Sequence, residues 1–262
     1  MTPEMFAALE ALTAQGQTLL ASLGLVFARL GPVFALTPVF GERAVPARIR
    51  LVAALAMSVV IAPAVTPQIP LPDPRLIPAA TFIASEALIG VTLGLALRLM
   101  VMALQMAGTM AAQATSLAQA FGGAGVEPQP AIAHVLVMAG LALAVLTGFA
   151  ERLAHFLVLS YQLFPAGLWP SPGDLAAWGV ARAAQAFALG FSLAAPFVIG
   201  SGLYNLALGA INKAMPQLMV AFIGAPALTL GGLVLLLLAA PVMMGAWLPA
   251  LHGTLADPTA LP

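Results

Sequence analysis

Long apolar runs, separated by short polar or proline-rich breaks, make up most of this chain. The runs cover about 18–40, 51–65, 76–120, 131–150, 175–204 and 225–248. A helix of roughly 20 apolar residues crosses a bilayer, and within lipid its backbone groups must find partners inside the segment. The pattern therefore predicts an all-α, polytopic membrane protein of about six hydrophobic segments.

The breaks predict where individual segments end. The fourth run should be interrupted at Glu151 and Arg152 and continue as a further apolar stretch, 153–164. Residues 165–174, which include Trp169, have the composition of a turn at the membrane interface. As one helix, the run 76–120 would extend about 60 Å, twice the hydrocarbon thickness, so it must break, tilt or project from the bilayer.

The composition supports a membrane protein without a sizeable soluble part. Hydrophobic residues make up 62% of the chain, charged residues 7%, and the mean hydropathy is +1.05. We therefore treat 1–262 as a single integral membrane domain. The formal net charge of zero, with no block of basic residues, gives no reason to expect nucleic acid as a partner.

The few charges suggest an orientation. Residues 41–50 hold Arg43, Arg48 and Arg50, so the positive-inside rule places this loop in the cytoplasm. Alternation through six spans then places Lys213 inside as well. No basic residue precedes Arg29, unlike the start of a signal peptide, so we expect the first apolar run to be retained as a span.

A polar stripe runs along the third segment. At 100° per residue its members project within about 60° of one direction, and a row of alanines lies opposite. The stripe is either the wet side of a helix that leaves the bilayer or the lining of a polar path through protein. Its members are Arg98, Gln105, Thr109, Gln113, Ser116 and Gln119.

Four ionisable residues lie within apolar runs, where they must pair, snorkel or face water. They are Arg29, Glu86, Arg98 and Arg182. Glu86 and Arg98 are about 18 Å apart along one helix and cannot pair with each other. Glu86 is open to two interpretations, structural pairing or proton relay. A stand-alone transporter or channel that uses Glu86, Arg98 and Arg182 is the alternative function.

Gly90 and Gly94 form a GxxxG motif, which predicts that another helix packs closely against the third segment.

Residues for catalysis or cofactor binding are lacking. The chain has no cysteine, its three histidines are scattered, and it has no nucleophile, zinc or phosphate-loop motif. We therefore expect a protein that is not an enzyme and that has no catalytic, metal or cofactor site.

Two polar segments remain. Residues 121–130 form the clearest loop by glycine and proline content and are either a connector or a gate beside the polar stripe. The candidate residues there are Phe121, Gly122, Gly123, Gly125, Val126, Glu127 and Pro128. Residues 205–217 form a polar island that is either a surface loop or a set of polar contacts inside an assembly. Its candidates are Asn205, Asn212, Lys213, Pro216 and Gln217.

Three stretches together resemble the FliR/SctT family of type III secretion export gate subunits. Residues 38–51, PVFGERAVPARIRL, are similar to the family pattern P-x-F-G-x-R-x-x-P-x-R-x-R, which contains Arg43, Pro46, Arg48 and Arg50. Residues 94–98, GLALR, with the helix beyond them, and then 155–165 with Gly167, are similar in order and spacing. Residues 206–218, LALGAINKAMPQL, followed by Phe222-Ile-Gly224, are similar to the C-terminal pattern, with Lys213 where arginine is usual.

The resemblance implies a subunit of the flagellar protein export gate, in the bacterial inner membrane within the flagellar basal body. Such subunits form kinked helical hairpins that can stand above the bilayer plane, so fewer than six segments need cross it. They assemble with FliP-like and FliQ-like proteins into a helical complex that unfolded flagellar substrates traverse. FlhB-like and FlhA-like components are further partners. A loop that corresponds to 121–130 plugs the closed channel, and the two outer motifs are expected to contact other subunits.

Overall fold

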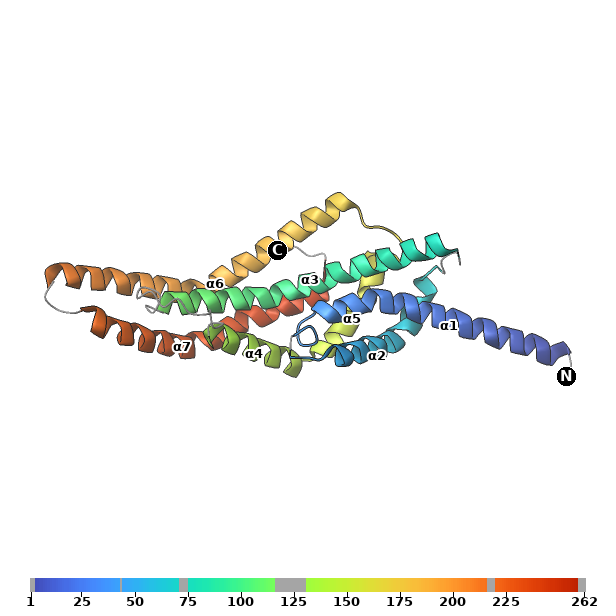
Figure 1. Ribbon diagram of the computed structural model, residues 1–262, viewed down its shortest axis with the longest axis horizontal. Coiled ribbons are helices and arrows are strands. Elements are labelled where there is room, and N and C mark those ends of the chain that lie inside the picture. Colours follow the sequence, from blue (N-terminus) through green and yellow to red (C-terminus); the bar gives the residue numbers. More distant parts are fainter. Residues whose placement is uncertain (1–2, 43, 71–74, 116–130, 216–219, 259–262) are drawn as a thin grey trace. The chain divides into compact units, whose positions relative to one another are not determined.

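The computed structural model describes residues 3–42, 44–70, 75–115, 131–215 and 220–258, and it is helical throughout this part of the chain. Figure 1 shows the order of the helices along the chain. They are α1 (Pro3–Leu36), α2 (Ala47–Val65), the short 3-10 helix η1 (Thr66–Gln68), α3 (Leu76–Thr115), α4 (Ala131–Leu146), α5 (Phe149–Leu163), α6 (Pro172–Ala214) and α7 (Val220–Ala256). The predicted all-α fold is confirmed.

Five helices in these ranges are long and apolar enough to cross a membrane, and the bent pair α4 and α5 makes a sixth if it counts as one span. This agrees with the expected number of about six. The third segment does not break within the described residues, because α3 is continuous over 40 residues.

Two predicted boundaries are wrong. The fourth run ends earlier than expected, at Thr147 and Gly148, because Gly148 has a φ of +82°, a left-handed conformation that terminates a helix. Glu151 lies in the first turn of α5, where a carboxylate favours the helix dipole rather than interrupting the helix.

The polar island is helical as far as Ala214. We expected the fifth segment to end near Tyr204, but α6 continues to Ala214. Residues 205–214 contain a single glycine and no proline, and are otherwise rich in alanine and leucine, which favour helix. Exposed polar side chains at Asn205 and Asn212 are compatible with that backbone.

The chain divides into two compact units. The first comprises 1–98, 148–180 and 253–261, and the second comprises 99–147 and 181–252. In the first unit α1 packs on α2, and α2 packs on α5. The two glycines of the GxxxG motif face α1, because a Cβ at Gly90 would overlap the carbonyl oxygen of Arg29 and one at Gly94 would lie 3.1 Å from the Cα of Val33. The predicted close packing at this motif is confirmed.

The second unit is centred on Trp247 of α7, which is fully buried. Its indole N–H donates to the carbonyl oxygen of Met100 on α3 at 2.8 Å, and its ring lies against Gly140 of α4. Gly108 of α3 leaves no room for a side chain against Ala133 of α4, and Gly190 of α6 approaches the backbone of α3 at Ala103. Small residues thus allow the helix backbones of this unit to approach closely.

Candidate functional site

The turn after α1 explains why the first motif contains its proline, phenylalanine and glycine. The N–H of Phe40 donates to the carbonyl oxygen of Pro38 at 2.9 Å, and Val39 between them has a φ of +70°, which is the geometry of a strained γ-turn. The ring of Phe40 packs on Phe34. A Cβ at Gly41 would lie 2.7 Å from the carbonyl oxygen of Thr37, so this position requires glycine.

Charged residues of the same motif stabilise this turn through hydrogen bonds. The Arg50 guanidinium donates to the carbonyl oxygens of Val45 and Glu42, which closes the loop that leads into α2. The Glu42 carboxylate accepts from Arg98 of α3 at 2.6 Å, in a pair that is about one quarter exposed. Pro46 precedes α2 as its N-cap. Arg48 is exposed, and Arg43 lies outside the described residues.

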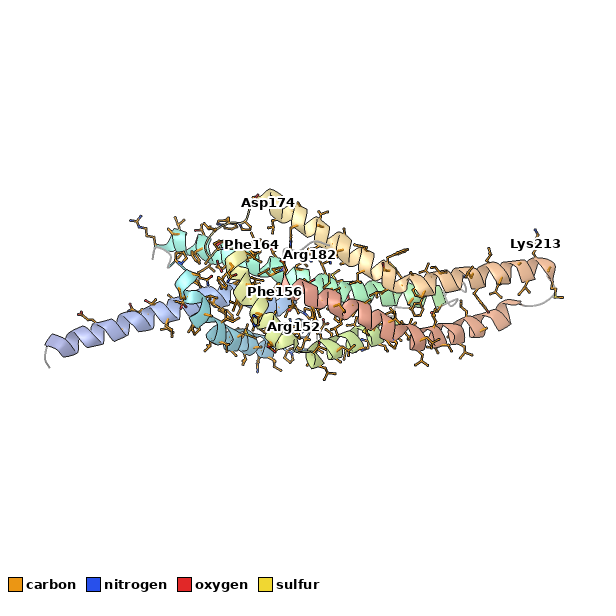
Figure 2. All side chains as sticks on the ribbon, turned by 180° about the vertical axis from the view of Figure 1, so that it is seen from behind. Arg152, Phe156, Phe164, Asp174, Arg182 and Lys213 are labelled. Atoms are coloured by element: carbon orange, nitrogen blue, oxygen red, sulfur yellow. The ribbon has the colours of Figure 1, made fainter. Side chains whose placement is uncertain are left out.

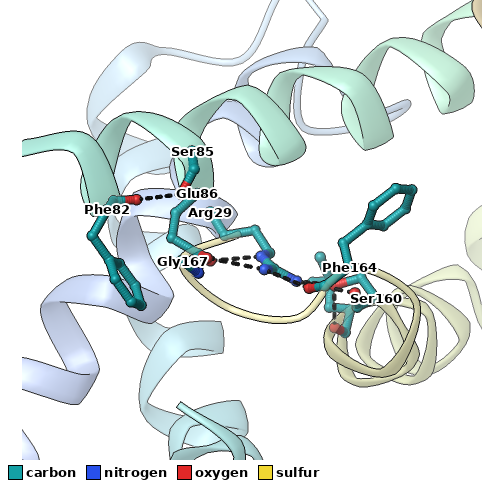
Figure 3. A network of polar contacts seen from close by, with 8 residues as sticks. Arg29, Phe82, Ser85, Glu86, Ser160, Phe164 and Gly167 are labelled. Carbon is teal, nitrogen blue, oxygen red and sulfur yellow. Dashed lines mark hydrogen bonds and ion pairs between the residues drawn. The ribbon is translucent and has the colours of Figure 1, made fainter. Parts of the chain in front are cut away.

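A buried cluster around Arg29 joins three segments of the first unit (Figure 3). Arg29 of α1 is fully buried and forms a bidentate pair with Glu86 of α3, with N–O distances of 2.7 and 3.1 Å. Its remaining N–H groups donate to the hydroxyl and carbonyl oxygens of Ser160 and to the carbonyl oxygen of Phe164. The guanidinium carbon lies 3.8 Å from the centre of the Tyr161 ring. These contacts engage all five N–H groups of the guanidinium.

The Arg29 cluster stabilises the end of α5 and the turn that follows it. The last carbonyl groups of a helix lack intrahelical partners and carry partial negative charge, so a guanidinium there is favourable. Glu86 also accepts from the backbone N–H of Gly167 at 2.9 Å. Gly167 has a φ of +78°, and a Cβ there would overlap the ring of Phe82. Both the conformation and the space require glycine.

These contacts favour one of the two interpretations of Glu86. Its partner is Arg29 of the same chain, and each of its oxygens accepts from a buried donor, which is typical of structural pairing. Arg98 pairs with Glu42, and buried Arg182 donates to Gln185 at 2.9 Å. Among the described residues, no group of three or more His, Asp or Glu side chains could hold a metal ion.

The two sides of α3 differ in burial. Ala103, Ala107 and Ala111 are fully buried, whereas Gln105 and Thr109 on the opposite side are half-buried and Gln113 is exposed. The Thr109 hydroxyl donates to the carbonyl oxygen of Gln105, so its own helix satisfies it. The alanine side thus supports packing within the protein, and the polar side is the more accessible of the two. Ser116 and Gln119 lie outside the described residues.

The C-terminal motif lies where α6 and α7 form a hairpin. The Tyr204 hydroxyl of α6 donates to the carbonyl oxygen of Gly224 on α7 at 2.9 Å, and a Cβ at Gly224 would lie 2.9 Å from the Leu208 side chain. Asn205, Asn212 and Lys213 are exposed, and Figure 2 shows Lys213 near the end of α6 with its side chain directed away from the helix. Pro216 and Gln217, and the whole candidate loop 121–130, lie outside the described residues.

The sequence analysis predicted no role for several residues that matter here. Ser160, Tyr161 and Gly167 complete the Arg29 cluster, and Trp247 organises the second unit. Arg29 and Glu86 could be singled out because they are oppositely charged residues within apolar runs. A hydroxyl, a ring and a backbone N–H at such positions carry no comparable signal, because their roles depend on which helices meet.

Comparison with known proteins identifies a family for this chain. Residues 20–253 match the family described as bacterial export proteins, family 1. The chain is 35% identical over 226 residues to the flagellar biosynthetic protein FliR of Caulobacter vibrioides, covering 85% of this chain and 90% of that protein. It is 30% identical to FliR of Bacillus subtilis, covering 77% and 79%, and 30% identical to FliR of Escherichia coli, covering 81% and 83%. The chain therefore belongs to family 1 of the bacterial export proteins.

Proposed function

We propose that this protein is a non-enzymatic subunit of the flagellar type III protein export gate in the bacterial inner membrane. The observation that carries the proposal is the similarity to FliR proteins over most of the chain, together with a match to the export family over residues 20–253. The gate would include FliP-like, FliQ-like, FlhB-like and FlhA-like partners. Unfolded flagellar proteins would be its cargo.

The polar side of α3 is the proposed channel lining. Polar side chains that face hydrocarbon are costly, whereas a water-filled path satisfies them. The amides of Gln105 and Gln113 lie opposite a buried alanine row, and the described part of the chain leaves Gln113 exposed and Gln105 half-buried. An extended, unfolded substrate offers backbone donors and acceptors along its length, which such amides can meet in any register.

The simplest test of the proposal is co-purification from membranes. A tagged chain should elute with the small export-gate proteins as one large hetero-oligomer. A transporter that works alone would instead behave as a monomer or small homo-oligomer, and it would move solute in liposomes. The buried pairing of Glu86 with Arg29 favours the first outcome, because both carboxylate oxygens already accept hydrogen bonds from donors of the same chain.

The channel-lining assignment predicts where a stalled substrate crosslinks. The chain has no cysteine, so Thr109→Cys and Gln113→Cys each introduce one reactive site. In assembled gates that hold a substrate with a non-exportable domain, both variants should crosslink to that substrate. Ser192→Cys on α6, which is exposed as Gln113 is, should not. Equal yields from all three variants would contradict the assignment.

If residues 121–130 plug the closed channel, as we propose, then shortening this segment should make the gate leak. Deletion of Gly122 to Gly125 should raise ion conductance or substrate passage in assembled gates, because a shortened loop cannot reach across the closed channel. Replacement of these four residues by four serines preserves the length of the loop and serves as the control. Unchanged conductance and export in the deletion variant would remove the plug assignment.

A further inference from the structure

The turn between α1 and α2 combines two unfavourable features at neighbouring residues. Val39 has a φ of +70°, which is uncommon for any residue with a Cβ and most unfavourable for a β-branched one. Thr37 is fully buried, and its hydroxyl has no hydrogen-bond partner among the described residues. Both features raise the free energy of this conformation, so contacts around the turn must hold it in place.

The contacts before Val39 differ in kind from those after it. On the side of α1, Thr37 and Pro38 are buried. On the side of α2, the turn is held by the ion pair of Glu42 with Arg98 of α3, whose side chains are 21% and 25% exposed. Closely packed backbone moves little, whereas a part-exposed ion pair is weak and can open. The turn can therefore change on the side of α2 while α1 stays in place.

We propose that the α1–α2 turn is a two-state switch, in which the pair of Glu42 with Arg98 holds the strained conformation. The strain at one residue and the stabilisation by one part-exposed ion pair are similar in size, so neither state is favoured by a wide margin. When the pair opens, Val39 can return to a negative φ, and the Thr37 hydroxyl can turn to a carbonyl oxygen of α1. The link into α2 then takes a different course.

The switch responds to charge, because the ion pair that holds it is in partial contact with solvent. Salt screens such a pair, and a carboxylate from another molecule can compete with Glu42 for Arg98. Arg50 does not replace Arg98, since it donates to the carbonyl oxygens of Val45 and Glu42 within the link itself. The inference depends only on the first unit and is independent of the proposed export function.

Hydrogen exchange of the purified full chain in detergent, followed by mass spectrometry, measures how often the turn opens. The amides of Phe40, Gly41 and Val45 report this opening, because each donates a hydrogen bond within the turn. Arg98→Met should raise their exchange several-fold, since the strained conformation loses its support. Residues 51–62 of α2 are the internal reference and should exchange as before. Unchanged exchange at the turn in Arg98→Met would refute the role of the ion pair.

The strain at Val39 has a readout of opposite sign. Val39→Gly should lower the exchange of the same amides several-fold, because glycine adopts a positive φ without steric cost. An unstrained turn would respond in the opposite direction, since glycine adds flexibility there. Val39→Ala removes the branched side chain but keeps the Cβ, so it should give only part of the decrease. Faster exchange in Val39→Gly, or equal exchange in the two variants, would overturn the proposal.

Ionic strength tests the ion pair without a change of sequence. Raising sodium chloride from about 0.05 M to about 0.5 M shortens the screening length, so exchange at the turn should rise in the unmodified chain. Arg98→Met has no pair to screen and should show no such rise. A rise of equal size in Arg98→Met would contradict the proposed switch.

Discussion

Arg29→Met should lower the free energy of unfolding by about 3–5 kcal/mol, because it removes the guanidinium that donates to both oxygens of the buried Glu86 carboxylate. The same change removes donors from Ser160 and Phe164 at the end of α5. The midpoint of denaturant unfolding in detergent, together with the amount of protein that accumulates in membranes, measures this loss.

Arg98→Met provides the matched control for this prediction. The pair of Arg98 with Glu42 has similar geometry but is about one quarter exposed, so its loss should cost no more than about 1 kcal/mol. The double variant Arg29→Met/Glu86→Leu separates charge from packing. It should recover much of the stability, since it leaves no unpaired buried charge. A double variant as unstable as Arg29→Met would show that lost packing, and not an uncompensated carboxylate, explains the effect.

Gly90→Ala should destabilise the first unit by about 1–3 kcal/mol, since a single added methyl overlaps the backbone of α1 at Arg29. A backbone oxygen cannot rotate out of the way, so the two helices must separate. That separation would also strain the neighbouring pair of Arg29 and Glu86. The unfolding midpoint of the variant in detergent, compared with that of the unmodified chain, measures the change.

Gly24→Ala is the control for this second prediction. Gly24 lies on α1, and a Cβ there meets no atom within 4 Å. Alanine is the better helix former by about 1 kcal/mol, so Gly24→Ala should be neutral or stabilising. If Gly90→Ala proved equally harmless, the close contact between α1 and α3 at the GxxxG motif would be contradicted.

The helical class and the membrane character follow from local properties of the chain. Within lipid each segment must satisfy its own backbone, so apolar length alone predicts a helix. Helix ends were predicted less well. The end of α4 depends on a left-handed conformation at Gly148, and the extension of α6 to Ala214 depends on helix formers that outweigh Asn205 and Asn212. The apolarity of the sequence predicts neither of these two helix ends.

In the Arg29 cluster, too, some features follow from a single helix and others depend on how the helices pack. Helix geometry along the chain already separates Glu86 from Arg98 by about 18 Å, and this exclusion is confirmed. The choice of Arg29 as partner, 57 residues away, depends on α1 packing against Gly90 and Gly94. Opposite charges in apolar runs predict that partners exist, but they do not identify them.

Class, number of segments and the polar side of α3 could be determined from the sequence because each arises within one helix. Three contacts could be identified only from the folded chain. They are the hydrogen bonds of Glu86, the ion pair of Glu42 with Arg98 that holds the α1–α2 turn, and the hydrogen bond from Trp247 to Met100. Each of these contacts joins residues far apart in sequence. Their geometry depends on how closely two helix backbones approach, which small residues permit but do not specify.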